Sequence, residues 1–317
     1  MNAACKISVV MSVHNDEATL TKAMESVLTQ DGQDFEFIVV IDGATDGSRA
    51  IAERFARTDE RVRVIVRENR GLTESLIEGC TLARGEFIAR QDADDMSLPG
   101  RFRKQLELLE TDPEITLAGC GTRFVTPEEH ELYHTFPDVI EAMAQVSACR
   151  LSGLQILSGH GSAMFRTSAY KQVGGYRKEF YFGQDVDLWI RLLEIGTFRS
   201  VDEILYTARL SPRGISSIRR PEQIALAALS LETARARRKG VSEEPFLLAA
   251  AQLPDRGAAP SKVFRSRIRE AQGLYFFGSC LSKRGNAIAR QYFLRSLAMW
   301  PLQIRSWYGL IRVWSSH

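Results

Sequence analysis

The sequence Arg90-Gln91-Asp92-Ala93-Asp94-Asp95 decides the interpretation of this chain. It follows a short apolar run at residues 87–89, which is typical of a buried strand. Ser97 and Pro99 come next and predict the start of a helix. Three carboxylates therefore stand within four residues at the carboxyl end of a strand. In an open α/β sheet, ligands bind at that edge.

The spacing of these carboxylates is compatible with two roles. Asp92 and Asp94 on an extended turn can point at one cation, which would relieve their repulsion. Oxygen ligands without His or Cys suit Mg²⁺ or Mn²⁺, and such ions usually bind substrate phosphates as well. A solvated acidic loop that caps the next helix would have a similar sequence.

Composition limits the class of protein. The chain has 317 residues, 44% hydrophobic and 25% charged, which is typical of a soluble globular protein with one large domain and an appendage. A net charge of +2 predicts no nucleic-acid partner. Five scattered cysteines predict reduced thiols in the cytoplasm. Lys6 leads directly into an apolar run and no run is long enough to span a bilayer, so we expect neither signal peptide nor transmembrane helix.

Residues 6–90 alternate between apolar runs and segments with helical periodicity. The runs predict strands at residues 7–11, 35–41, 62–66 and 87–89. Strands that alternate with helices form a parallel sheet with helices on its faces. We therefore predict an α/β fold with a Rossmann-like, mostly parallel sheet flanked by helices. Residues 1–220 would form the catalytic domain and residues 221–317 a helical C-terminal appendage.

Polar residues follow each predicted strand, where a parallel sheet would bring them to one edge. They include Ser12, His14 and Asn15 after the first strand and Asn69 after the third. Asp42 ends the second strand, too early to cap the next helix. Its carboxylate could accept a hydrogen bond from the imide N–H of a nucleobase.

As an ordered set, these motifs resemble a family 2 glycosyltransferase with the glycosyltransferase-A fold over roughly residues 6–220. The motifs are Val-Val-Met-Ser-Val-His-Asn at residues 9–15, the Asp-Gly-Ala-Thr-Asp-Gly-Ser turn at 42–48, Asn-Arg-Gly-Leu at 69–72 and Asp-Ala-Asp-Asp at 92–95. The resemblance implies a nucleotide-diphospho-sugar donor, with a UDP-sugar as the preferred candidate. It also implies Mn²⁺ or Mg²⁺ as cofactor.

The resemblance also implies roles for individual residues. Asp42 would contact the base, Asp94 would bind the metal, and Asp92 would lie near the ribose and the sugar. The other donor-binding candidates are Ser12, His14, Asn15, Asn69, Gly71, Leu72, Gln91 and Ala93. Two positions depart from the family pattern, because Ile41 and Ile77 stand where many relatives have Asp and Asn. Both departures would alter donor contacts.

A second cluster spans residues 174–192. Asp185 stands at the start of a predicted helix, where the residues alone would allow it to be an N-cap. The family's acidic pair falls on Gln184-Asp185, so the resemblance implies that Asp185 is the catalytic base. The candidates for acceptor-side or structural roles are His160, Gly175, Tyr176, Gln184, Trp189 and Arg191.

These features predict an inverting hexosyltransferase on the cytoplasmic face, acting in bacterial surface polysaccharide or glycolipid assembly. Its acceptor would be a saccharide or a lipid-linked hydroxyl. A sugar-phosphate nucleotidyltransferase would need a Gly-rich basic loop after the first strand, which residues 12–15 do not supply. A non-catalytic nucleotide-sugar binding protein would lack a base such as Asp185. A processive synthase would carry transmembrane helices.

The C-terminal segment has a different composition. Residues 262–317 contain ten basic residues and a single acidic one, Glu270. A predicted helix there has an apolar stripe that consists of Ile304, Trp307, Ile311 and Trp314. Such a basic amphipathic helix can lie in an anionic membrane interface. The stripe could instead pack on the preceding helices or on a second subunit, which would give a homodimer.

Overall fold

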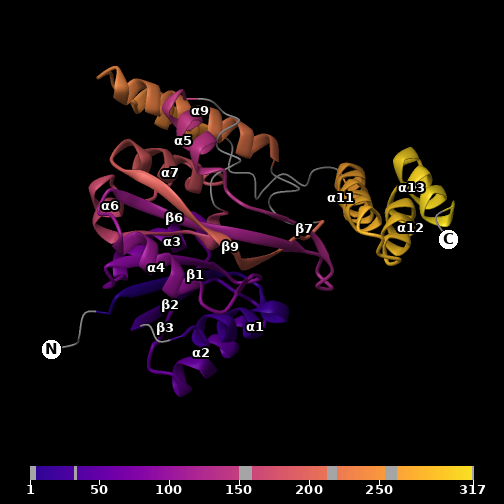
Figure 1. Cartoon of the computed structure of the whole chain (residues 1–317), viewed down its shortest axis with the longest axis horizontal. Helices are drawn as coiled ribbons and strands as arrows, with labels where there is room; N and C mark the ends of the chain where they lie inside the picture. Colours follow the sequence, from indigo (N-terminus) through magenta and orange to yellow (C-terminus); the bar gives the residue numbers. More distant parts are fainter. Residues whose placement is uncertain (1–4, 32–33, 150–158, 213–219, 254–262, 316–317) are drawn as a thin grey trace. The chain divides into compact units, whose positions relative to one another are not determined.

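The computed structural model describes residues 5–31, 34–149, 159–212, 220–253 and 263–315 (Figure 1). The strands are β1 (Ile7–Val13), β2 (Phe35–Asp42), β3 (Val62–Arg67), β4 (Phe87–Asp92), β5 (Met96–Ser97), β6 (Ile115–Val125), β7 (Glu131–Thr135), β8 (Met164–Arg166) and β9 (Thr197–Arg209). The α-helices are α1 (Glu17–Leu28), α2 (Ser48–Thr58), α3 (Leu72–Leu82), α4 (Arg101–Glu110), α5 (Val139–Ser147), α6 (Thr167–Gln172), α7 (Gln184–Glu194), α9 (Arg220–Arg238), α10 (Glu244–Gln252), α11 (Val263–Lys283), α12 (Ala289–Met299) and α13 (Ile304–Ser315).

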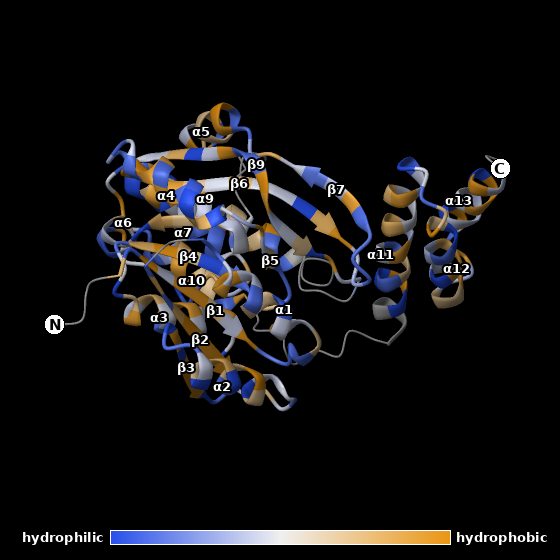
Figure 2. Ribbon diagram, turned by 60° about the horizontal axis from the view of Figure 1, so that its bottom comes forward, coloured by the Kyte–Doolittle hydropathy of each residue, from blue (hydrophilic) through white to orange (hydrophobic). Residues whose placement is uncertain are grey.

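The strands form one sheet in the order β3-β2-β1-β4-β8-β6-β9-β5, with β7 paired to β6. Strands β1, β2, β3 and β4 run parallel to one another. They are also the four strands predicted from apolar runs, and Figure 2 shows the hydrophobic colour of β1 and β2. Strand β8 is antiparallel to both β4 and β6. The predicted α/β fold is confirmed.

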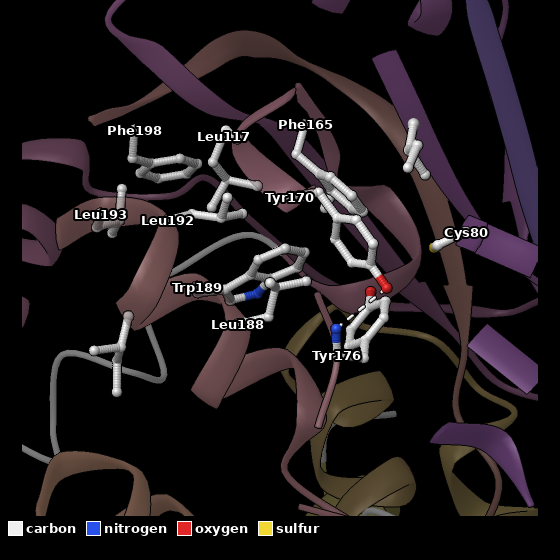
Figure 3. Packing of buried hydrophobic residues seen from close by; sticks show 14 of the residues in the cluster. Cys80, Leu117, Phe165, Tyr170, Tyr176, Leu188, Trp189, Leu192, Leu193 and Phe198 are labelled. Atoms are coloured by element: carbon white, nitrogen blue, oxygen red, sulfur yellow. Dashed lines mark hydrogen bonds between the residues drawn. The ribbon is translucent and has the colours of Figure 1, made fainter. Parts of the chain in front are cut away.

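Helices cover both faces of the sheet because successive residues of each strand point to opposite sides. Val9 and Met11 of β1 belong to a core with residues of α1, α2 and α4. Val10, between them, belongs to a second core with residues of α3, α5, α6, α7 and α9. Figure 3 shows part of this second core, where Trp189 of α7 lies among leucines near Phe165, Tyr170 and Tyr176. The doubly covered sheet holds the strand ends in fixed positions.

One local prediction is wrong, and one alternative role is excluded. Ser97 does not open a helix but pairs with Tyr206 in the short strand β5, and α4 begins at Arg101. The residue before it, Gly100, has a φ of 80°, a left-handed conformation that favours glycine. Asp185 is not an N-cap, because Gly183 occupies that position and Asp185 lies within the first turn of α7.

The chain divides into two compact units. The first contains residues 1–122, 135–208 and 224–253, and the second contains residues 123–134, 209–223 and 254–317. Helices α9 and α10 thus group largely with the first unit, although the predicted boundary lay at residue 220. As a boundary between functional domains, that position stays a prediction. In the described part of the chain, every helix is too short or too polar to cross a lipid bilayer.

The second unit has its own small core. Leu132 packs there with Leu274 and Phe277 of α11 and Phe293 of α12. Helix α13 adds Leu310 and Val313 to this core. The four members of the predicted stripe of α13 are 52–66% exposed, although Arg290 of α12 lies over the Trp314 ring. The expectation that the stripe packs on the preceding helices is therefore wrong.

Candidate active site

A buried arginine holds the acidic turn at the end of β4. Asp92 lies beside Ser12 of β1 in the sheet register. The guanidinium of Arg90, which is 0% exposed, donates to the Asp92 carboxylate. It also donates to the backbone carbonyls of Val10 and Gln91 over 2.8 and 2.9 Å. Because charge-assisted hydrogen bonds fix geometry well, Asp92 is held at a defined place on the sheet edge.

The predicted donor-binding residue Gln91 lies beneath the turn. Its side-chain amide donates to the backbone carbonyls of Asp92 and Asp95 over 3.1 and 3.0 Å. Its carbonyl accepts from Ser97 and Arg101 over 2.7 and 3.2 Å. With no exposed surface, Gln91 can influence a ligand only through the backbone that it supports. Its neighbour Ala93 is 5% exposed, also on the inner side of the turn.

Asp42 at the end of β2 is 2% exposed and already accepts three hydrogen bonds. Arg67 Nε and the Arg70 N–H donate to Oδ1, both over 2.9 Å. The Gly71 N–H donates to Oδ2 over 2.7 Å. A carboxylate has about four acceptor positions. A nucleobase N–H would therefore have to use the remaining position, and the base contact of Asp42 stays a prediction.

The other predicted donor-side residues gather around Asp42. His14 Nδ1 donates to the Asp42 backbone carbonyl over 2.7 Å, and the Asn69 amide lies 3.4 Å from His14 Nε2. Asn15 Oδ1 accepts from the backbone of Thr45 over 2.7 Å. Leu72 begins α3 directly after Gly71, so the Asn-Arg-Gly-Leu motif reaches the same edge. The structure thus brings the ends of β1, β2 and β3 together.

Asp185 lies in the first turn of α7. Burial raises the pKa of its carboxyl above the ordinary value, and the negative charge of Asp92 raises it further. Backbone N–H groups of the helix start and the Arg90 guanidinium act in the opposite direction. The charges of Asp92 and Arg90 thus both act on the Asp185 carboxyl. A partly buried carboxylate with a raised pKa is a stronger base than a solvated one.

His160 links the acidic turn to the rest of this site. Its Nε2 atom accepts from Tyr176 Oη over 2.8 Å and from Arg90 Nε over 3.3 Å. Burial and the Arg90 charge hold the pKa of His160 well below the ordinary value, so the ring is neutral at pH 7. Its edge contacts Trp189, with ring centroids 6.0 Å apart. His160 therefore orients Arg90 as an acceptor and does not act as a cation.

The remaining predicted candidates lie behind the site. Trp189 is 1% exposed, and Arg191 forms a buried ion pair with Asp187. Gly175 has a φ of 67° and approaches Tyr170 so closely that a Cβ would lie 2.7 Å from its ring. These residues shape α7 and its surroundings. Gln184 Oε1, in contrast, is buried without a hydrogen-bond partner in the described chain.

Two residues of the site carried no signal in the sequence. The Tyr206 hydroxyl of β9 accepts from the Asp92 backbone N–H over 3.3 Å. Gly161 is packed against both residues, since a Cβ there would lie 2.1 Å from the Tyr206 hydroxyl oxygen and 2.5 Å from Asp92 Oδ2. Both come from segments far from Asp92 in sequence. Only the strand pairing of β9 and the position of β8 beside β4 bring them there.

The acidic turn suits a divalent cation shared with a substrate. Among the residues that the structure describes, no three His, Cys, Asp or Glu side chains are grouped as a complete metal site. Asp92 and Asp94 offer hard oxygen ligands, which match Mg²⁺ or Mn²⁺. Such ions often take the rest of their coordination from water and phosphate oxygens. The two carboxylates fit a site in which the protein supplies only some of the metal's ligands.

Comparison with known proteins identifies the family. The model of the family described as "Glycosyl transferase family 2" matches residues 8–174, which include the acidic turn and His160. This chain belongs to glycosyl transferase family 2. It is a glycosyltransferase, and the alternative reading as a nucleotidyltransferase is not supported.

Curated relatives agree with this assignment. The protein EpsE of Bacillus subtilis (strain 168), named as a glycosyltransferase, is 34% identical over 215 residues, which cover 66% of this chain and 74% of EpsE. The amylovoran biosynthesis glycosyltransferase AmsE of Erwinia amylovora is 28% identical over 192 residues, covering 60% of this chain and 70% of AmsE. In each case the match leaves about a third or more of this chain outside it.

Solved structures of low sequence identity share the fold of this glycosyltransferase. The mannosyltransferase PcManGT from Pyrobaculum calidifontis, solved with GDP-Man and Mn²⁺, has a TM-score of 0.56 at 16% identity and covers 99% of this chain and 87% of its own. Residues 1–349 of TarS from S. aureus, solved with UDP-GlcNAc, have a TM-score of 0.58 at 15% identity and cover 98% and 91%. The predicted glycosyltransferase-A fold is confirmed.

Proposed function

We propose that this glycosyltransferase moves a sugar from a nucleotide-diphospho-sugar to a hydroxyl acceptor with inversion at the anomeric carbon. The observation that carries the proposal is the Asp185 carboxyl in the first turn of α7, whose pKa is raised by burial and by the charge of Asp92. A donor bound along the ends of β1, β2 and β4 would present its anomeric carbon between the acidic turn and α7.

The proposed reaction needs one base. As the acceptor oxygen attacks the anomeric carbon, the Asp185 carboxylate takes the hydroxyl proton. The bond between the anomeric carbon and the diphosphate oxygen breaks, and its electron pair leaves with the nucleoside diphosphate. A single displacement inverts the configuration, and the site offers one base rather than an enzymic nucleophile for a second displacement.

The donor would be held by residues at the ends of four strands, β1 to β4. Asp42, His14 and Asn69 form the base side, and Ser12 and Asp92 lie on the sugar side. We propose a UDP-sugar because an imide N–H is a suitable partner for the last acceptor position of Asp42. The structural neighbours include complexes with UDP-GlcNAc and with GDP-Man. The identity of the donor's nucleobase therefore has to be tested directly.

Asp94, with Asp92 and Asp95 in support, would hold Mn²⁺ or Mg²⁺. When bound, such an ion stabilises negative charge on a leaving diphosphate. Asp95 is 7% exposed and its charge acts on Tyr206, so its contribution would come from inside the turn. Asp92, fixed by Arg90, would then mainly orient the sugar.

We further propose that the reaction belongs to bacterial surface polysaccharide or glycolipid assembly, at the cytoplasmic face. The name of AmsE places that relative in amylovoran biosynthesis. The five cysteines of this chain are unpaired, as expected for a reducing compartment. The acceptor would be a saccharide or a lipid-linked hydroxyl.

A panel of nucleotide-sugars with Mn²⁺ would test the proposal, with the Asp185→Asn variant as the decisive comparison. The variant should bind nucleoside diphosphate as the parent does in calorimetry, while transfer falls about 10²–10⁴-fold. Asp202→Asn, at an exposed position of β9, is the matched control and should keep full activity. Normal turnover by Asp185→Asn would exclude the proposed base, and retained anomeric configuration in the product would exclude inversion.

A further inference from the structure

Helix α13 packs through small residues and through Leu310 and Val313, and leaves its other large apolar residues outside. Ser306 is 0% exposed and its hydroxyl lies 2.8 Å from that of Ser296 in α12. Gly309 lies against the Phe293 ring, where a Cβ would be 2.5 Å from Cζ. These close contacts define the inner face of α13.

The outer face is an aromatic stripe, which consists of Ile304, Trp307, Tyr308, Ile311 and Trp314. Their exposed fractions are 66%, 52%, 70%, 62% and 66%, respectively. Leu302, just before the helix, is 74% exposed. Scattered exposed apolar residues are ordinary, but a contiguous group of this size marks an interaction surface. Two Trp and one Tyr are the side chains that prefer the boundary between water and lipid.

Arginines flank the aromatic stripe. Arg305 and Arg312 are seven residues apart and exposed, so they share one edge of the helix. The Arg290 guanidinium lies over the Trp314 ring, 5.2 Å from its centroid. Residues 262–317 carry ten basic residues and one acidic residue, whereas the net charge of the whole chain is +2. The apolar surface is thus set in a strongly cationic segment.

We propose that the aromatic stripe docks on an anionic lipid bilayer and lies in its interface, parallel to the surface. Apolar area provides the insertion and the arginines provide attraction to anionic headgroups. A second copy of the chain is a poorer occupant, because pairing two stripes would bring two sets of arginines together. The inference rests on the surface of α13 and is independent of the proposed reaction.

Flotation of the full-length protein with vesicles tests this proposal. We expect the protein to float with vesicles that contain phosphatidylglycerol but not with pure phosphatidylcholine vesicles. Flotation should weaken as salt rises from 50 to 500 mM, since screening reduces headgroup attraction. Replacing Arg305 and Arg312 by Gln should lower the partition coefficient about five-fold for each charge.

A stripe variant and a matched control separate docking from a general effect of apolar residues. Trp307→Ser combined with Ile311→Ser and Trp314→Ser should lose flotation at least ten-fold. Ile140→Ser with Leu248→Ser, at positions 84% and 54% exposed in the first unit, should float as the parent does. Circular dichroism would confirm that both variants are folded.

Fluorescence gives a readout that needs no variant. Three of the four tryptophans lie at or near the stripe, and the fourth, Trp189, is buried. Anionic vesicles should therefore shift the emission to the blue, and brominated lipids should quench it. An intact chain that neither floats nor shifts its emission overturns the proposal. A stripe variant that floats as well as the parent, or one that only changes the mass from dimer to monomer, also overturns it.

Discussion

Gly161 lies directly against the carboxylate of Asp92, with room for a hydrogen atom but not for a methyl group. A Cβ at position 161 would lie 2.5 Å from Asp92 Oδ2 and 2.1 Å from the Tyr206 hydroxyl oxygen. Gly161→Ala must displace one or both side chains. We predict a fold that stays intact and a donor affinity that falls about ten-fold or more, measured by calorimetry with a nucleotide-sugar and Mn²⁺.

Gly159→Ala is the control for this prediction, because a Cβ at that position would meet Ser162 at an ordinary distance of 3.5 Å. This second variant should bind the donor as the parent does. Equal affinities of all three proteins would show that the position of Asp92 does not matter for donor binding.

The pH dependence of transfer should follow the Asp185 carboxyl. As a base it must be ionised, so the rate falls when the pH drops through its pKa. Burial and the charge of Asp92 raise that pKa, which places the acid limb of kcat/KM above the ordinary Asp value of about 3.9. Asp92→Asn removes one of the two causes, and the limb should move to lower pH. An acid limb that stays at the same pH in Asp92→Asn would show that the charge of Asp92 does not raise the pKa of Asp185.

Metal dependence should be traceable to the acidic turn. Calorimetry of a nucleoside diphosphate should show binding with Mn²⁺ and at least ten-fold weaker binding in EDTA. Asp94→Asn should reproduce the effect of EDTA in the presence of metal, because an amide oxygen is a weaker ligand for a hard cation. Asp112→Asn, an acidic residue after α4, is the control. An Asp94→Asn variant with normal metal-dependent binding would exclude the proposed ligand.

Asp16 should make stability depend on pH. Burial and the charge of Asp46 raise the pKa of its carboxyl from 3.8 to about 6. A raised pKa favours the protonated form in the folded state, so this contribution to stability is full below about pH 4 and is lost as the pH rises through 6. Asp16→Asn can still accept from the His14 N–H. We predict an increase in the free energy of unfolding at pH 7 of about 1–3 kcal/mol.

Urea unfolding between pH 4 and pH 8 checks the effect of Asp16. The free energy of unfolding of the parent should decrease between pH 4 and 6. Asp16→Asn should not show this decrease. Asp202→Asn, at an exposed surface position, should keep the pH dependence of the parent.

The parallel half of the fold could be predicted from sequence because its strands are buried on both faces. All eight residues of β2 are buried, so the strand appears as an apolar run, broken only by Glu36, that ends at Asp42. Strand β9 gives no such signal. It alternates irregularly between buried and exposed residues over Thr197–Arg209. Its position is fixed by pairing with β6 and β5, which no local pattern encodes.

The same distinction applies to the site. The carboxylates at the end of β4 and in α7 could be recognised from the sequence, because acidic residues in these motifs indicate metal binding or base catalysis. Gly161 and Tyr206 position Asp92 through contacts between distant segments, and a Gly and a Tyr are common anywhere. Gln91 shows the opposite error, because it lies within a motif that predicts donor binding but is buried under the turn.

The second unit is formed by segments that lie far apart in the sequence, and this has a consequence during synthesis. Leu132 is buried there against Leu274, about 140 residues further along the chain. At about 5–20 residues per second, a ribosome needs roughly 7–30 s to make the intervening sequence. For that time Leu132 has no partner in α11, and the neighbouring hairpin is exposed to chaperones and aggregation. A transcript that stops before codon 263 would make this exposure permanent.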